Sequence, residues 1–153
     1  EGLTSCLMKV SIGNIQSALY TVPLNTAGPA AFEYTESSGR LMAAALDEAY
    51  RVVGSANPVE RGKVLQLYAN GLGPVADPQK SGEAATAISS TRSTPEVTIG
   101  GQTAQVLYSG VAPGAAGLYQ VNVIVPAGAP TGIQPVVIRI DGIASKPTST
   151  VLR

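Results

Sequence analysis

The stretch Lys63-Val64-Leu65-Gln66-Leu67-Tyr68-Ala69-Asn70-Gly71-Leu72-Gly73-Pro74 decides the fold class of this chain. Its first seven residues place Leu and Ala side chains at every second position, which is the period of a strand with one buried face. Gly71 and Gly73 then allow a sharp bend in the backbone around Leu72. Pro74 stiffens the chain that follows. We therefore expect a strand that ends with Leu72 pointing inward.

Similar short runs, rich in β-branched residues and closed by Gly, Asn, Asp or Pro, occur on both sides of this stretch. Such runs are typical of strands joined by tight turns. We count about ten of them, and besides residues 63–69 they include residues 7–12, 15–22, 30–35, 96–99, 103–108, 118–125, 135–140 and 148–152. The chain is therefore expected to be all-β.

The turn residues between these runs agree with that expectation. Gly13-Asn14 joins two runs, and both residue types tolerate positive φ, which predicts a two-residue hairpin. Gly100 and Gly101 supply the positive φ angles of a second hairpin turn. Pro126 is expected to end the run 118–125, because proline cannot donate a hydrogen bond to the next strand.

Run 118–125 also shows which face should be buried. Leu118, Gln120, Asn122 and Ile124 share one face by the two-residue period of a strand. Tyr119, Val121, Val123 and Val125 share the other face, and we expect this second face to lie in the core.

The composition limits the classes of partner. A chain of 153 residues can bury a core as one domain, and that core must be aliphatic, because only 5% of residues are aromatic. Ten basic residues balance ten acidic ones without clustering, so a nucleic-acid partner is not expected. The longest apolar runs are far shorter than the ~20 residues that span a bilayer. No membrane span is expected either.

The residue types present argue against catalysis. The chain has no histidine, the commonest general base, and its one cysteine, Cys6, has no neighbour other than Lys9 to activate it. Ser145 and Lys146 are adjacent, so in a strand they would face opposite sides. The paired acids at 33/36 and 47/48 are interpreted as solvated turn charges. We expect no enzyme, no catalytic residue and no cofactor.

Metal binding is not expected, because clusters of Cys or His and the acidic spacing of a calcium loop are missing. One alternative stays open, a weak calcium site built from backbone carbonyls and one or two of the carboxylates of Asp77, Glu83 and Asp141.

Two segments are less regular. Residues 40–53 place Leu41, Ala44 and Ala45 at helical spacing, so a short helix and a hairpin both remain possible there. Residues 76–95 are rich in Ser, Thr, Ala, Gly and Pro without any period, and we expect a long exposed loop.

An internal repeat links the two ends of the chain. Residues 10–17, Val-Ser-Ile-Gly-Asn-Ile-Gln-Ser, match residues 138–145, Ile-Arg-Ile-Asp-Gly-Ile-Ala-Ser, at an offset of 138 − 10 = 128. The later pair Thr21-Val22 matches Thr150-Val151 at an offset of 150 − 21 = 129, which implies one inserted residue. We interpret residues 1–28 as the closing hairpin of a preceding similar module or an N-terminal extension, and residues 29–153 as the sandwich domain.

The start of the chain and its strand edges lead to two further expectations. The chain starts at Glu1 without an initiating methionine, and we expect it to be a piece of a longer precursor. A hairpin that belongs to another module also leaves an open strand edge, so weak self-association through an edge strand is expected.

Several of the segments described above together resemble a known family. They are residues 62–74, Val97-Thr98-Ile99-Gly100-Gly101, residues 117–123 and Val125-Pro126-Ala127-Gly128. In these segments the chain resembles the Solibacter-type C-terminal domain of acidobacterial proteins, a family of unknown function. It is more distantly similar to the IPT/TIG immunoglobulin-like domains. The resemblance implies an immunoglobulin-like antiparallel β-sandwich, with Gly71, Gly73, Pro74, Gly100, Gly101 and Pro126 as structural turn positions.

The resemblance also implies two short strands and a turn within residues 40–53. Here Leu46-Asp47-Glu48-Ala49-Tyr50 stands where the family has a Gly-containing turn. This departure keeps the helix open as an alternative.

The function implied is a non-catalytic module, secreted or at the cell surface and of the adhesion type, attached to a larger bacterial protein. Its partner would be an unknown protein or a polysaccharide of the cell envelope. The alternative function is a carbohydrate-binding module. Six tyrosines, at positions 20, 34, 50, 68, 108 and 119, are the aromatic residues that could serve it.

Overall fold

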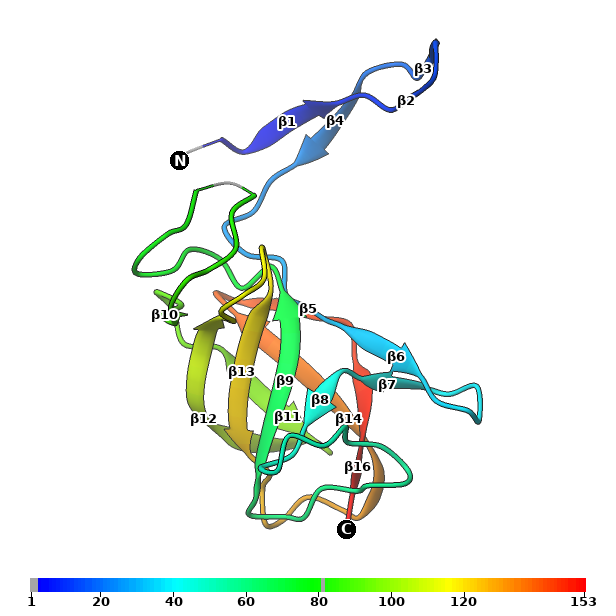
Figure 1. The fold of residues 1–153 in the computed structure, drawn as a ribbon, viewed down its shortest axis with the longest axis vertical. Coiled ribbons are helices and arrows are strands. Elements are labelled where there is room, and N and C mark those ends of the chain that lie inside the picture. The colour runs from blue at the N-terminus through cyan, green and yellow to red at the C-terminus, as the bar shows by residue number, and fades with distance from the viewer. Residues whose placement is uncertain (1–2, 81) are drawn as a thin grey trace.

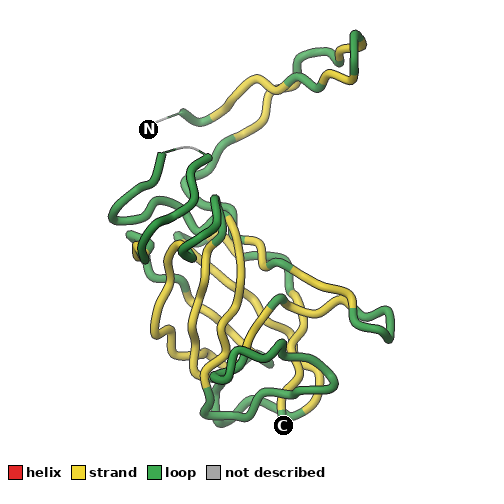
Figure 2. Tube along the Cα trace, viewed as in Figure 1, coloured by secondary structure: helices red, strands yellow, loops and turns green. Residues whose placement is uncertain are grey.

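The computed structural model describes residues 3–80 and 82–153, and over these residues the chain is all-β without a helix (Figure 2). Sixteen strands are present in this part, more than the ten expected, because several of the expected runs are broken into shorter pieces. In chain order the strands are β1 (Ser5–Met8), β2 (Ser11–Ile12), β3 (Ile15–Gln16), β4 (Tyr20–Pro23), β5 (Ala30–Ala31), β6 (Glu33–Thr35), β7 (Leu41–Ala43), β8 (Ala45–Leu46), β9 (Val64–Asn70), β10 (Ser89–Ser90), β11 (Glu96–Ile99), β12 (Gln102–Val111), β13 (Tyr119–Ile124), β14 (Gly132–Ile140), β15 (Ile143–Ala144) and β16 (Thr148–Leu152).

Ten of these strands form one antiparallel sheet that folds over into a sandwich (Figure 1). Its main order is β15-β14-β11-β12-β13-β9-β5, with β16 beside β14, β8 beside β9 and β10 beside β12. The long strand β12 pairs with β11 through its first residues and with β13 through the rest, and its register shifts between Val106 and Tyr108. A bulge of this kind bends a strand, and it lets β12 belong to both layers.

The core lies between the two layers and is aliphatic, as expected. Leu65 and Leu67 from β9 and Val121 and Val123 from β13 are fully buried. They pack in one cluster with residues of β11 and β14, such as Ile99. The alternation expected for residues 118–125 is confirmed, because Val121, Val123 and Val125 are all fully buried.

Residues 40–53 form strands, so the helix alternative is wrong. Strand β7 pairs with β6, and β8 pairs with the middle residues of β9 at one edge of the sheet. Pairing with these neighbours buries Met42, Ala43 and Ala45, and it overrides the helix propensity of a run rich in Ala and Leu.

Residues 76–95 are less exposed than expected. Most of them are irregular and exposed, but Ser89 and Ser90 form β10 against the end of β12. Ala85 is buried in a small cluster with Val75 and Val111. The loop is therefore attached to the sandwich at two points, because its few apolar side chains find partners there.

The chain enters the sandwich at one end and leaves it at the other (Figure 1). At the entry, the Gly28 amide donates to the Gly71 carbonyl just after β9, and Ala27 is already buried in the core. At the exit, the Arg153 amide donates to the Val59 carbonyl, shortly before β9 begins. The entry therefore lies just after β9 and the exit shortly before it, and the seven residues of β9 span about 20 Å.

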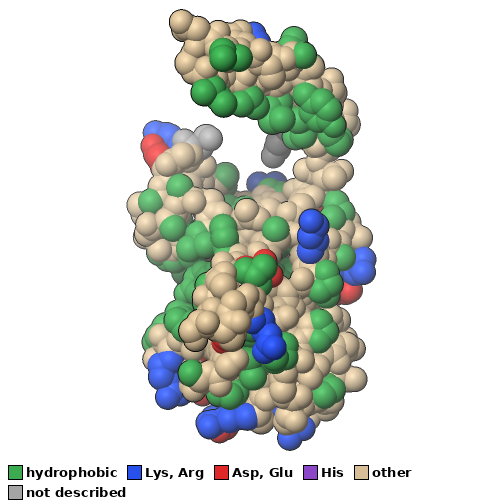
Figure 3. All heavy atoms as spheres, turned by 90° about the vertical axis from the view of Figure 1, so that its right-hand side faces the viewer, with side chains coloured by type: hydrophobic (Ala, Val, Ile, Leu, Met, Phe, Trp, Pro, Cys, Tyr) green, Lys and Arg blue, Asp and Glu red, His purple; other side chains and the backbone are tan. Residues whose placement is uncertain are grey.

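The N-terminal hairpin, residues 4–24, projects from the entry end of the sandwich. It consists of two small antiparallel sheets, β1 with β4 and β2 with β3. The turn at Gly13-Asn14 joins β2 to β3, as expected. Hydrophobic side chains are exposed at several places on this projecting part (Figure 3).

Candidate functional site

The site with the most unusual geometry is the Asp47 turn, defined here as residues 47–51. It joins β8 to residues 52–53, which bridge back to Leu46 and Ala45. The Tyr50 amide donates to the Asp47 carbonyl (3.0 Å), and the Asp47 amide donates to the Arg51 carbonyl (3.0 Å). This is a three-residue hairpin loop whose last residue takes the left-handed conformation. That residue is Tyr50, with φ 58°.

Tyr50 therefore occupies the position in this kind of turn where a glycine is the usual choice. The left-handed conformation costs a non-glycine residue about 1–2 kcal/mol. The side chain gains no compensating burial, because 75% of the residue is exposed. Strained conformations of this kind occur preferentially at functional sites.

The carboxylate of Asp47 stabilises the turn through hydrogen bonds. Its Oδ1 accepts hydrogen bonds from the Ala49 and Arg51 amides, both at 2.9 Å. Its Oδ2 accepts from Nε of Arg51 (2.9 Å) and Nδ2 of Asn57 (3.0 Å). Asp47 is buried, so the interpretation of this acid as a solvated charge is wrong. Sequence reasoning missed the site, although an Asp followed by a small turn is a known signal for side chain to backbone bonds.

A shallow hollow lies beside the Asp47 turn. Its charged lining consists of three ion pairs, Arg51–Asp47 (2.8 Å), Lys63–Glu48 (3.5 Å) and Arg153–Glu60 (2.6 Å). Ala49 and Arg51, the two neighbours of Tyr50 in the chain, both line it. The hollow thus offers carboxylate, guanidinium and ammonium groups, and Tyr50 itself is exposed and is not part of its lining.

The hydrogen bonds to Asp47 lower the pKa of its carboxyl group well below the usual range, with the Asn57 amide as the largest cause and the Arg51 amide next. An acid whose pKa is lower in the folded state stabilises the fold above its unfolded pKa of about 4, and this contribution is lost as the pH falls. We expect the stability of the chain to decrease with acidification below about pH 4. Asp47→Asn should flatten this decrease, measured by urea denaturation across a pH series.

The matched control for this prediction is Asp77→Asn, which removes an exposed acid of the loop 76–95. Its pH profile should run parallel to that of the unchanged chain. A profile of Asp47→Asn that is also parallel would contradict the role of this carboxylate.

A second prediction concerns the strain at Tyr50. Tyr50→Gly should raise the free energy of unfolding by about 0.5–1 kcal/mol, because relief of the left-handed strain exceeds the backbone entropy that glycine adds to the unfolded chain. Tyr50→Ala removes the same ring but keeps the strain, and it should bring no such gain. Thermal unfolding of the two variants checks this, and equal midpoints would refute it.

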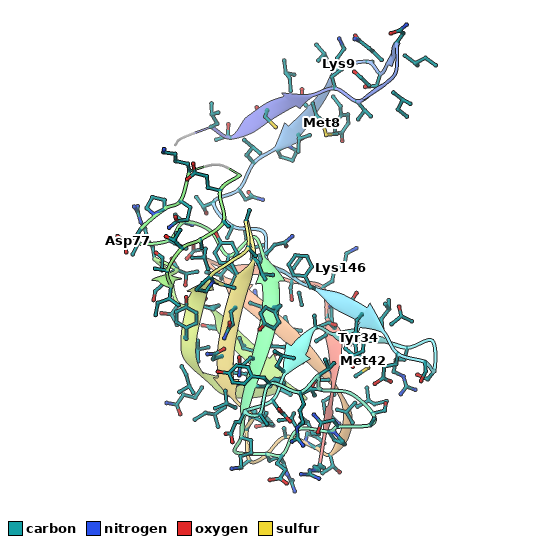
Figure 4. The ribbon with its side chains drawn as sticks, in the orientation of Figure 1. Met8, Lys9, Tyr34, Met42, Asp77 and Lys146 are labelled. Atoms are coloured by element: carbon teal, nitrogen blue, oxygen red, sulfur yellow. The ribbon has the colours of Figure 1, made fainter. Side chains whose placement is uncertain are left out.

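The other tyrosines are differently placed. Tyr34, Tyr108 and Tyr119 donate their hydroxyls to the carbonyls of Val53 (2.8 Å), Val111 (3.0 Å) and Gly73 (2.6 Å). Burial raises the pKa of all three hydroxyl groups. Tyr34 lies on β6, opposite Met42 of the paired strand β7 (Figure 4). These three rings are part of the fold, whereas Tyr20 and Tyr50 are mostly exposed.

The remaining candidate acids and the Ser–Lys pair also serve the fold. Glu36 accepts from the amide (2.6 Å) and the hydroxyl (2.8 Å) of Ser55, which lowers its pKa, mainly through the amide bond. Glu33 accepts from the hydroxyl of Thr148 at 2.7 Å. Ser145 is buried and its hydroxyl accepts from the Ile138 amide, while Lys146 is exposed; both lie between β15 and β16 and not in a strand.

The turn positions named from the sequence lie where the chain bends. Gly71 and Gly73 have φ 69° and 81°, and Leu72 between them is buried. Gly100 and Gly101 both have positive φ between β11 and β12. The other two turn positions expected from the sequence are Pro74, which follows this bend, and Pro126, which follows the end of β13 at Ile124.

Neither a metal cluster nor a membrane-spanning helix is present in the part of the chain that the structure describes. Within residues 3–80 and 82–153, no three Asp, Glu or Cys side chains come close enough together to hold a metal ion. Of the calcium candidates, Glu83 forms an ion pair with Lys80 at 4.0 Å, and Asp77 lies far out on its loop (Figure 4). The same part of the chain contains no helix with the length and hydropathy of a membrane span.

Comparison of the chain with protein-family models, with curated proteins and with solved structures found no match.

Proposed function

We propose that this chain is a non-catalytic module of a larger bacterial protein, secreted or exposed at the cell surface, in which it spaces and presents other regions as adhesion-type modules do. The observation that supports this proposal best is the position of entry and exit. The chain joins the sandwich beside Gly71 and leaves it beside Val59, at opposite ends of β9. Modules with this geometry can form a linear array in one polypeptide.

Three features support the mechanical side of the proposal. The entry is held firmly, because the Gly28 amide bonds to Gly71 and Ala27 is buried in the core. The exit is held by a ladder of bonds between Val59 and the end of β16. The described carboxylates at positions 33, 36 and 47 all accept bonds that fix strands or turns. We also propose that the sandwich has the immunoglobulin-like topology. We propose that the chain is related to the Solibacter-type domain.

The test is the location of the full-length protein in its own cell. Antibodies raised against the 153-residue chain should label intact cells or the culture medium. Labelling that requires cell lysis and follows a cytosolic marker would reject the extracytoplasmic role.

A second candidate function, carbohydrate binding, is favoured by the exposed side chain of Tyr50, whose two neighbours in the chain, Ala49 and Arg51, line the charged hollow. Sugar-binding sites combine an apolar aromatic face with a few well-placed polar groups. The hollow supplies such groups through Glu48 and Lys63 on one side and Glu60 and Arg153 on the other. A polysaccharide of the cell envelope is the ligand we propose for this function.

A glycan array followed by titration of the best binder tests this second function. Binding should be lost in Tyr50→Ala and in the more stable Tyr50→Gly, and it should survive in Tyr20→Ala, which removes the other mostly exposed tyrosine. Equal binding by all three variants would exclude the Asp47 turn as the site.

A further inference from the structure

The N-terminal hairpin repeats the strand pairing of the C-terminal hairpin, residues 132–152, residue by residue. In the first, Ser5 pairs with Pro23 and Met8 with Tyr20. In the second, Ile133 pairs with Val151 and Val136 with Thr148. The differences 133 − 5, 151 − 23, 136 − 8 and 148 − 20 all equal 128. The tips agree as well, because Ser11–Gln16 corresponds to Arg139–Ala144 at the same offset.

The constant offset corrects one detail of the sequence comparison. Thr21 and Val22 were matched to Thr150 and Val151 through an inserted residue. The pairing matches them to Ser149 and Thr150 at an offset of 128, so no residue is inserted.

The two hairpins also share a specific set of hydrogen bonds. The Val10 amide donates to Oγ of Ser17 (3.1 Å), and the Ser17 amide donates to the Val10 carbonyl (2.9 Å). In the C-terminal hairpin the Ile138 amide donates to Oγ of Ser145 (3.0 Å), and the Ser145 amide donates to the Ile138 carbonyl (2.7 Å). In both hairpins a serine hydroxyl accepts the hydrogen bond that a backbone carbonyl of the paired strand would normally accept. This shared detail is more specific than the general similarity of any two β-hairpins.

The burial of the two hairpins is opposite. Val136, Ile138 and Ile140 are almost fully buried in the sandwich core. Their N-terminal counterparts are Met8, Val10 and Ile12, which are 47%, 53% and 79% exposed. Met8, Val10 and Ile12 share one face by the two-residue period of a strand, and Lys9 points to the other side of the hairpin from Met8 (Figure 4). The N-terminal hairpin thus has the pattern of a core strand without a core.

The C-terminal hairpin shows what covers such a face. Strand β11 pairs with residues 136–139 of β14, so that Val97 lies opposite Ile138 and Ile99 opposite Val136. Since Ile138 bonds towards Ser145, the alternate residues Val137 and Arg139 direct their amides towards β11. In the described part of the N-terminal hairpin, β1 and β2 pair only with β4 and β3. The counterparts Lys9 and Ser11 therefore face an open edge.

We propose that residues 4–24 are the last two strands of another β-sandwich of this kind, which lies N-terminal to this one in the same polypeptide. The missing neighbour of Lys9 and Ser11 is then that module's counterpart of β11, and its core covers Met8, Val10 and Ile12. Consecutive modules repeat every 128 residues, and each passes directly from its closing strand into the buried Ala27 of the next. This inference rests on the proposed function, which makes the chain one module of a larger protein.

A tandem chain tests this proposal in vitro, independently of where the protein is located in the cell. Residues 25–131 are joined directly to residues 4–153, so that Thr131 is followed by Thr4 as it is normally followed by Gly132. The tandem should sediment as a monomer. The amides of Lys9 and Ser11 should exchange about a hundredfold more slowly than in the 153-residue chain, because an amide in a paired strand exchanges only when the strand opens. Cys6, the one cysteine of both chains, should react more slowly with a thiol reagent.

Val10→Asp is the matched variant. It should leave the stability of the 153-residue chain unchanged, because Val10 is exposed there, and it should abolish the added protection in the tandem. Exchange at Lys9 and Ser11 that is as fast in the tandem as in the single chain would overturn the proposal, and so would an unfolded first copy. Protection that appears only in a dimer would identify a second chain as the partner and would overturn it too.

Discussion

Gly71→Ala is expected to lower the free energy of unfolding by about 3 kcal/mol or more. Two penalties add. The residue has φ 69°, a conformation that costs alanine about 1–2 kcal/mol. Its Cβ would also overlap the carbonyl oxygen of Gly28 and lie 2.7 Å from the carbonyl carbon. Both atoms belong to the backbone of the entry segment, which is fixed by the bond from the Gly28 amide to Gly71.

The control for this variant is Gly62→Ala. Gly62 has φ 79°, but a Cβ there meets nothing within 4 Å, so only the conformational penalty of about 1–2 kcal/mol applies. Urea denaturation of both variants separates the two contributions. Equal losses would show that the close approach of Gly28 to Gly71 has no energetic weight, which would contradict the description of a firmly held entry.

Leu67→Ala is expected to cost about 2–5 kcal/mol, the range for a leucine removed from a packed core. Leu67 is fully buried in strand β9, opposite Val121 of β13 and Ala45 of β8. These neighbours are held by sheet pairing and cannot move in to fill the cavity. Total stability of a domain is only about 5–15 kcal/mol, so the variant should be close to the limit of folding.

Leu107→Ala provides the comparison. It makes the same substitution at the bulge of β12, where the leucine is half exposed, and its cost should stay within about 0.5 kcal/mol. The unfolding free energies of both variants, taken from the same denaturant titration, check the prediction. Similar losses for the two leucines would mean that the core is not where the structure places it.

The regular strands could be predicted from the sequence because their two-residue period reflects burial on one face. Strands β11 and β16 have the bounds expected, residues 96–99 and 148–152. The run 30–35 was expected as one strand but is divided at Phe32. Ala31 still pairs with β9, and Glu33 already pairs with β7. Such a change of partner depends on distant strands and has no local signal.

The turn at residues 47–51 shows a second limit. Local spacing in residues 40–53 allowed a helix, and the tertiary pairing of β8 with β9 decided otherwise. The strained tyrosine and the buried aspartate of the Asp47 turn could not be recognised from the sequence. The turn has no glycine, and the bond to Asn57 spans ten residues.

The internal repeat was visible in the sequence, but only the pairing gives it physical content. Eight residues suggested a likeness between two hairpins, whereas the register extends it from Ser5 to Pro23 without an insertion. The exposed face of the first hairpin could not be predicted, since the same pattern is buried in the second.

The measurement that tests this account most directly is amide hydrogen exchange of the 153-residue chain, comparing Lys9 and Ser11 with their counterparts Val137 and Arg139. If residues 4–24 are a closing hairpin without its sheet, Lys9 and Ser11 should exchange at nearly the rate of an unfolded chain. Val137 and Arg139, paired with β11, should be protected by a factor of about a hundred or more. Equal protection at the two pairs of positions would contradict the account, because it would mean that the N-terminal hairpin already has its partner within this chain.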